Sequence, residues 1–140
     1  MSPSKPAYLL DSFALLAYLE DEPGKERVQE LLSLAETKKC RLVMCLVNLG
    51  EALYIVERER GLPLAQSVLA LVESLPVELL DATRDLVLDA AHVKAGHALS
   101  YADAFAVAAA LREQATVITG DPEFGSVEDL VHVEWLAKGL

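Results

Sequence analysis

Residues 99–122 read LSYADAFAVAAALREQATVITGDP, an alanine-rich helical segment followed by a short β-branched run. Ser100 is a favourable N-cap, and Asp103 three residues later gives the start the form of a capping box, in which two side chains satisfy free backbone N–H groups. The run at 116–119 is typical of a strand, and Gly-Asp-Pro at 120–122 is a turn signal. A helix that leads into a buried strand is the repeating unit of a parallel sheet.

The same alternation extends from this stretch to both ends of the chain. Apolar runs predict strands at residues 8–10, 41–46, 77–80, 116–119 and 130–136. Apolar residues at helical spacing predict helices at residues 13–19, 25–38, 51–60, 64–74, 84–94 and 100–113. Strands separated by helices predict an α/β fold with a mostly parallel central sheet and helices on both faces. We expect residues 1–140 to form a single domain, because no linker or internal repeat interrupts the pattern.

The bulk composition is that of an ordinary globular protein. Of the 140 residues, 53% are hydrophobic and 24% are charged. No apolar run approaches the roughly 18 residues that a membrane span needs, and the N-terminal six residues lack the pattern of a signal peptide. Cys40 and Cys45 have no CxxC spacing, so we expect free thiols and a cytoplasmic location.

The net charge of −10 restricts how the chain can bind nucleic acid. Proteins that hold nucleic acid by electrostatics are usually basic, because Lys and Arg replace the counterions of the phosphates. This chain would need bound metal to neutralise a local acidic cluster, or a partner to supply positive charge. The simpler alternative is that acidity keeps a small cytosolic protein soluble.

Four acidic residues fall where an open parallel α/β sheet binds its ligands, beyond the carboxyl ends of the strands. Asp11 and Asp121 each follow an expected strand, whereas Asp103 and Glu51 lie in the first turns of expected helices. Hard cations such as Mg²⁺ take oxygen ligands, and enzymes that cleave phosphodiesters present several carboxylates to one or two such ions. The four acids match that requirement if the fold brings them together.

Each acid also has a purely structural interpretation, and the local sequence leaves both open. Asp11 is a possible N-cap of the helix that follows it. Asp103 has the place of the acid in a capping box and is favoured there by the helix dipole. Asp121 before Pro122 is a common turn start, and Glu51 fits a solvated helix surface.

Four segments, taken in order, resemble the PIN-domain nucleases over nearly the whole chain. The segments are LLDS at 9–12, NLGEALY at 48–54, LSYADAF at 99–105 and TGDPEF at 119–124. The resemblance implies a three-layer α/β/α PIN-like fold and a ribonuclease that uses Mg²⁺ or Mn²⁺ to cleave RNA phosphodiester bonds. The compact length is similar to that of the VapC-like toxins of toxin–antitoxin pairs.

By this resemblance, Asp11, Glu51 and Asp103 would be the core metal ligands and catalytic residues, and Asp121 would complete the pocket. Ser12, Asn48 and Thr119 would orient these carboxylates or the phosphate. The resemblance also implies a homodimer silenced by an antitoxin peptide, which would place an arginine in the acidic pocket.

The chain departs from the family pattern at Val107, where some members carry a further acid one helical turn beyond the third segment. The resulting expectation is a site that holds one metal well and a second poorly. His92, His97 and His132 have no catalytic-triad context, and we interpret all three as structural or exposed.

Three other functions compete with the nuclease. A HAD-type phosphatase needs a second aspartate two residues after the first, where this chain has Phe13. A receiver domain needs an acid pair before its phospho-acceptor strand and a late lysine, and neither is evident. A PIN fold that binds RNA or a protein partner without cutting remains open.

Overall fold

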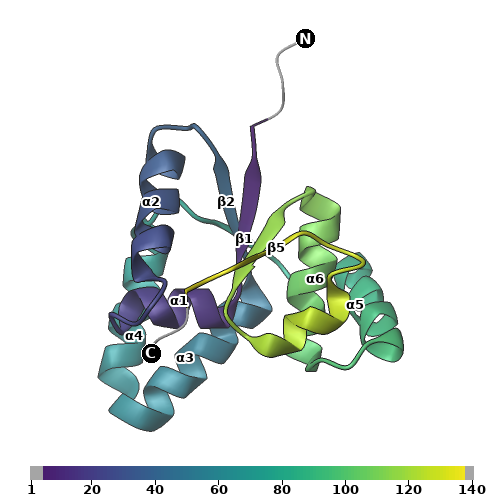
Figure 1. Ribbon diagram of the computed structural model, residues 1–140. Coiled ribbons are helices and arrows are strands. Elements are labelled where there is room, and N and C mark those ends of the chain that lie inside the picture. Colours follow the sequence, from purple (N-terminus) through teal and green to yellow (C-terminus); the bar gives the residue numbers. More distant parts are fainter. Residues whose placement is uncertain (1–4, 138–140) are drawn as a thin grey trace.

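The computed structural model describes residues 5–137 and places a parallel sheet at the centre of the chain (Figure 1). Within the described residues, five strands lie in the order β3-β2-β1-β4-β5. The strands are β1 (Ala7–Leu10), β2 (Arg41–Cys45), β3 (Glu78–Leu80), β4 (Thr116–Thr119) and β5 (Val133–Trp135). Every neighbouring pair is parallel, so the predicted α/β class is confirmed and the described sheet is parallel throughout. Part of the N-terminal segment judged for a signal peptide lies outside the described residues.

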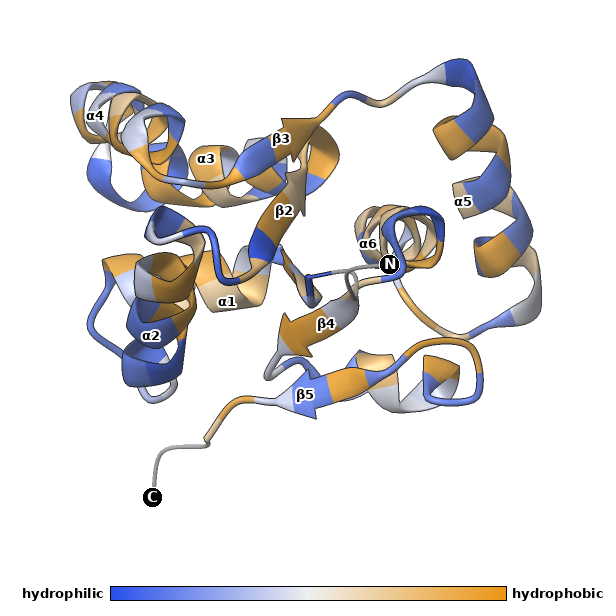
Figure 2. Ribbon diagram, turned by 90° about the horizontal axis from the view of Figure 1, so that it is seen from above, coloured by the Kyte–Doolittle hydropathy of each residue, from blue (hydrophilic) through white to orange (hydrophobic). Residues whose placement is uncertain are grey.

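Helices cover both faces of this sheet and complete the three expected layers (Figure 2). They are α1 (Ser12–Leu19), α2 (Lys25–Glu36), α3 (Leu46–Arg60), α4 (Leu62–Ser74), α5 (Arg84–Gly96) and α6 (Tyr101–Glu113). In Figure 2 the helices α5 and α6 lie on one side of the sheet and α1 to α4 on the other.

Successive side chains along a strand point to opposite faces of the sheet and pack against the two helical layers alternately. Leu9, Val43 and Val117 pack in the cluster formed with α5 and α6. Leu10 and Ile118, one residue further along β1 and β4, pack in the cluster formed with α1 and α2. Because both faces are covered, the strands consist of continuous apolar runs rather than alternating polar and apolar residues.

The alanine-rich segment that opened the sequence analysis forms the central helix of its layer. Residues 103–110 of α6 are buried without interruption, and most of them are alanines. Small side chains let a helix approach the sheet and a neighbouring helix closely, and α6 packs against both β1 and α5. This close packing fixes the first turn of α6, which carries Asp103.

Several elements differ from the sequence-based expectations. Helix α3 begins at Leu46 rather than near residue 51, directly after β2 and without a side-chain cap. The absence of a polar N-cap made the apolar run at its start look like continued strand. A 3₁₀ helix, η1 (Pro122–Val127), was not expected, and β5 is shorter than predicted. The early start of α3 places Asn48 and Glu51 on the same helix.

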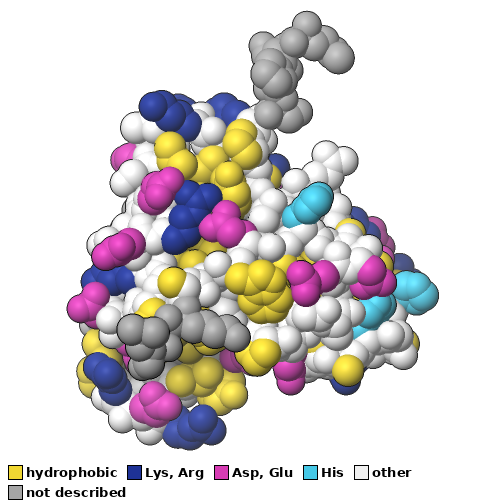
Figure 3. All heavy atoms as spheres, viewed as in Figure 1, with side chains coloured by type: hydrophobic (Ala, Val, Ile, Leu, Met, Phe, Trp, Pro, Cys, Tyr) yellow, Lys and Arg dark blue, Asp and Glu magenta, His cyan; other side chains and the backbone are white. Residues whose placement is uncertain are grey.

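Charges of both signs mix on the molecular surface. On the face shown in Figure 3, Lys and Arg side chains lie among Asp and Glu side chains instead of forming a separate basic patch. Cys40 and Cys45 are free and buried, as expected. Among the described residues, no helix is both long enough and apolar enough to cross a membrane.

Candidate metal centre

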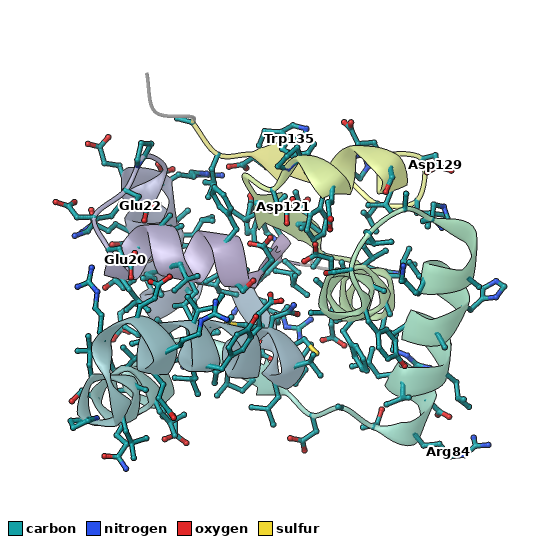
Figure 4. The ribbon with its side chains drawn as sticks, turned by 90° about the horizontal axis from the view of Figure 1, so that it is seen from below. Glu20, Glu22, Arg84, Asp121, Asp129 and Trp135 are labelled. Atoms are coloured by element: carbon teal, nitrogen blue, oxygen red, sulfur yellow. The ribbon has the colours of Figure 1, made fainter. Side chains whose placement is uncertain are left out.

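The four acids singled out in the sequence lie together at the carboxyl edge of the sheet. Asp11 directly follows β1 and Asp121 follows β4, and these strands are neighbours with Leu10 opposite Ile118. Figure 4 looks onto this edge and shows Asp121 near its centre, in the region between α1, α3 and α6. Helices α3 and α6 carry Glu51 and Asp103. The fold therefore joins residues that are far apart in the sequence.

Asp11 is both a helix cap and a member of the pocket. Its Oδ1 accepts a hydrogen bond of 2.8 Å from the backbone N–H of Ala14, and its Oδ2 accepts one from the hydroxyl of Thr119. The side chain is only 1% exposed. Burial raises the pKa of Asp11 to about 7; the two hydrogen bonds oppose the rise, and the negative charges of Asp121 and Glu51 add to it. The two interpretations left open by the sequence are therefore compatible.

Asp103 does not have the capping role that the sequence suggested. The Ser100 hydroxyl accepts from the Asp103 N–H at 3.1 Å, which is one half of a capping box. The other half is not formed by Asp103, because the Ser100 N–H donates to Glu123 at 3.1 Å instead. The Asp103 carboxyl is left facing the other acids. Burial, followed by the charge of Asp121 and the hydrogen bond with Glu123, raises the pKa of Asp103 well above its usual range.

Glu123 joins the pocket, although its place in the sequence did not predict this. Carboxylate oxygens of Asp103, Asp121 and Glu123 lie within 4.8 Å of one another. Asp121 also caps η1 by accepting from the Glu123 N–H at 2.9 Å, so its turn interpretation is correct as well. The available signal was an acid two residues after Asp121 in the segment TGDPEF. Nothing in the local sequence showed that the turn of η1 brings it back to α6.

Glu51 lies beside this cluster rather than within it. Its Oε1 accepts a hydrogen bond from the Ser12 hydroxyl at the start of α1, and the side chain is half-buried. Its negative charge contributes to the raised pKa of both Asp11 and Asp103. The interpretation of Glu51 as a freely solvated surface residue is therefore wrong. Among the described acids, Asp103, Asp121 and Glu123 are close enough to bind one metal ion, and Asp11 and Glu51 lie beside them.

Two polar residues fix the positions of the segments that carry the acids. Thr119, which is fully buried, donates to Asp11 and accepts from the Asp121 N–H at 3.0 Å. Asn48 is also fully buried, and its Nδ2 donates to the Ala102 carbonyl in α6 at 3.0 Å. The Asn48 Oδ1 has no hydrogen-bond partner among the described residues. A buried acceptor without a donor calls for a water molecule or an ion beside it.

Within the described part of the chain, no basic side chain neutralises the negative charges of the pocket. Within residues 5–137, no ion pair includes any of the five acids. Asp11 and Asp103 are buried, Glu51 and Asp121 are half-buried and Glu123 is exposed. Holding the two buried carboxylates charged without a counter-charge is costly. The donor set consists of oxygen atoms alone, which suits a hard divalent cation such as Mg²⁺ or Mn²⁺. Two of the histidines, His92 and His132, are exposed, and His97 contacts the Val93 carbonyl, so none belongs to this centre.

Comparisons with known proteins agree with the fold. Residues 8–130 match the sequence profile of the PIN domain. The VapBC2 complex from Rickettsia felis, solved with a DNA fragment from its promoter, aligns with a TM-score of 0.74 at 20% identity and covers 94% of this chain and 99% of that chain. VapC20 from Mycobacterium tuberculosis, a toxin that cleaves the sarcin–ricin loop, aligns with a TM-score of 0.68 at 18% identity over 86% of this chain and 94% of that chain. VapBC-1 from nontypeable Haemophilus influenzae aligns with a TM-score of 0.66 at 23% identity, over 92% of this chain and 98% of that chain. No curated protein sequence matches the chain.

Proposed function

The chain belongs to the PIN-domain family, and from this premise we propose that it is a divalent-metal-dependent endoribonuclease. The observation that carries the proposal is the cluster of Asp103, Asp121 and Glu123, whose oxygens lie within 4.8 Å of one another. No ion pair among the described residues offsets this charge. A site of this kind is the form in which phosphodiester-cleaving enzymes hold their metal ions.

We assign Asp103, Asp121 and Glu123 as ligands of one cation, with Asp11 and Glu51 completing the centre beside it. When bound, Mg²⁺ or Mn²⁺ supplies the activation of a water molecule for in-line attack on a backbone phosphate and stabilises the leaving 3′ oxygen. Val107 stands where some family members carry a further acid. Glu123 provides a carboxylate in its place, from η1 instead of from α6.

The surrounding residues hold the carboxylates in position. Ser12 donates to Glu51 and Thr119 donates to Asp11, and these hydrogen bonds fix the orientation of the two carboxylates. Asn48 ties α3 to the first turn of α6 through Ala102, next to Asp103. The three side chains act as positioning residues for the metal centre.

The biological setting that we propose is a toxin–antitoxin pair. The solved structures similar to this chain include VapBC complexes and a VapC toxin that cleaves the sarcin–ricin loop. An acidic pocket suits a basic antitoxin peptide with an arginine placed among the carboxylates. The same proposal includes a cytoplasmic homodimer and a single domain that spans the chain.

One specific observation favours a second candidate, a PIN fold that binds RNA or a partner without cutting. The net charge of −10 weakens unaided RNA binding, and therefore favours the form of this candidate that binds a protein partner. The two candidates separate in a cleavage assay on mixed tRNA and rRNA with Mg²⁺, with Mn²⁺ and with EDTA, beside the Asp11→Asn variant. Cuts that require metal and disappear in the variant support the nuclease. Intact RNA in every lane, with Mn²⁺ binding absent by calorimetry, would favour the interaction module.

A further inference from the structure

Phe13 is an exposed aromatic residue close to two acids of the centre, because it lies two residues after Asp11 and packs against Gly120, the residue before Asp121. It is the second residue of α1, two positions after Asp11, and its side chain is 38% exposed. Its chain neighbours Ser12 and Ala14 are both buried. The capping of α1 by Asp11 fixes this first turn, so the ring is presented to solvent from a rigid element.

The ring of Phe13 lies directly against the backbone of Gly120, the residue before Asp121. A Cβ atom at position 120 would come within 2.6 Å of the ring Cζ and closer still to Cε1, separations that real Cβ atoms essentially never show. Only glycine leaves room for the ring here. Phe13 therefore packs against the segment that leads to Asp121, and 38% of its surface remains exposed.

The arginine side chains, which could otherwise pair with phosphate, are engaged elsewhere on the protein. Ion pairs with Asp or Glu hold five of them: Arg27, Arg41, Arg60, Arg84 and Arg112. The guanidinium of Arg58 lies 5.4 Å from the centre of the Tyr54 ring. Phosphate contacts from these arginines would compete with their existing partners, so an uncharged contact near the centre would add to RNA binding.

Base stacking is such a contact, because every nucleobase has an aromatic face that an exposed ring can cover without any charge. Bases inside a duplex are already stacked on one another, whereas those in loops and single strands are free to stack on a side chain. We infer that Phe13 is the stacking platform for an unpaired base next to the phosphate that is cut. The inference rests on the proposed function and narrows its substrate to single-stranded RNA or RNA loops.

The test compares Phe13→Leu, which removes the aromatic face, with Phe13→Tyr, which keeps it. Leu111→Ala is the control for loss of an exposed apolar side chain, because Leu111 is 46% exposed and lies about 12 Å along α6 from Asp103. The probe is a short single-stranded RNA of mixed sequence that contains 2-aminopurine. For Phe13→Leu we expect KM to rise about tenfold, with kcat and Mn²⁺ affinity nearly unchanged. Phe13→Tyr and Leu111→Ala should behave as the wild type.

A second readout reports stacking itself, which a merely structural role of Phe13 would not change. In the Asp103→Asn background, which prevents cleavage, RNA binding should quench 2-aminopurine fluorescence, and Phe13→Leu should abolish the quenching. A duplex version of the same RNA should bind weakly. Equal KM and equal quenching with and without the ring would overturn the stacking role while leaving the nuclease intact. A wild-type protein that neither cuts nor binds the RNA would remove both proposals.

Discussion

The hydroxyl of Thr119 donates a hydrogen bond to the buried carboxylate of Asp11, across 108 residues of sequence. The two residues stand at the carboxyl ends of the neighbouring strands β4 and β1. The same hydroxyl accepts from the Asp121 N–H, so one side chain joins two of the acids. The position of the centre therefore depends on strand pairing as well as on the acids themselves.

Replacing Thr119 with valine should lower the free energy of unfolding by about 1–3 kcal/mol, because the buried Asp11 carboxylate and the Asp121 N–H each lose a partner. Thr116→Val is the matched control in the same strand, where the side chain is half-buried and makes no hydrogen bond to another described side chain. Urea unfolding in EDTA measures both variants. Equal stability of the two would show that the Thr119 hydroxyl does not support the site.

The raised pKa values predict how the metal-free protein responds to pH. The pKa of Asp11 rises from 3.8 to about 7 on folding, so the folded state binds the proton more tightly than the unfolded state. Protonation of Asp11 therefore stabilises the fold fully below about pH 4. This stabilisation is lost as pH rises toward about 7, and the free energy of unfolding falls by up to about 1.4 kcal/mol per pH unit. The pKa of Asp103 shifts in the same direction.

Asp103→Asn isolates this effect, because it removes one titrating group and keeps the shape of the side chain. In EDTA, the stability of the variant relative to the wild type should increase as pH rises above about 4. Added Mn²⁺ should raise the melting temperature of the wild type and leave that of the variant nearly unchanged. Differential scanning fluorimetry over a pH series measures both effects. A constant difference at all pH values would mean that Asp103 titrates normally in the fold.

Glu123 can be tested without disturbing the start of α6. Glu123→Gln removes the charge but retains an oxygen that can accept from the Ser100 N–H. If Glu123 is a ligand, Mn²⁺ affinity should fall by about tenfold or more. Glu128→Gln, which removes the same charge from an exposed residue just after η1, should bind Mn²⁺ as the wild type does. Calorimetric titrations that do not distinguish the two variants would exclude Glu123 from the centre.

Gly120 and Gly50 should respond in opposite ways to alanine. At Gly120 the new Cβ meets the Phe13 ring, so the ring or the β4–η1 connection must shift, and we expect a loss of about 1–3 kcal/mol. At Gly50, in the middle of α3, a Cβ meets nothing within 4 Å, and alanine should stabilise the helix by about 0.5–1 kcal/mol. Chemical denaturation measures the free energy of unfolding of both variants and of the wild type. A harmless Gly120→Ala would mean that Phe13 is not held against this backbone.

The layered fold and the positions of Asp11 and Asp121 could be predicted from the sequence for definite physical reasons, whereas the grouping of Glu51 and Asp103 with them followed from the resemblance to PIN-domain nucleases. Buried parallel strands are continuous apolar runs, and ligands bind beyond their carboxyl ends, which placed Asp11 and Asp121 correctly. Glu123 was missed because its contact with Ser100 spans 23 residues and arises only after η1 has folded. The start of α3 was missed because Cys45 provides no side-chain cap. Strand order depends on pairing across the sheet, which local patterns do not encode.

We propose that the carboxylate centre holds a divalent cation and uses it to cut RNA. The most direct measurement is the rate of RNA cleavage as a function of Mn²⁺ concentration, for the wild type and for Asp103→Asn at equal protein concentration. We predict a saturable, EDTA-sensitive rate for the wild type and a loss of at least about a hundredfold for the variant, whose fold is retained. Cleavage by Asp103→Asn at the wild-type rate, or a wild-type rate independent of Mn²⁺, would contradict the account.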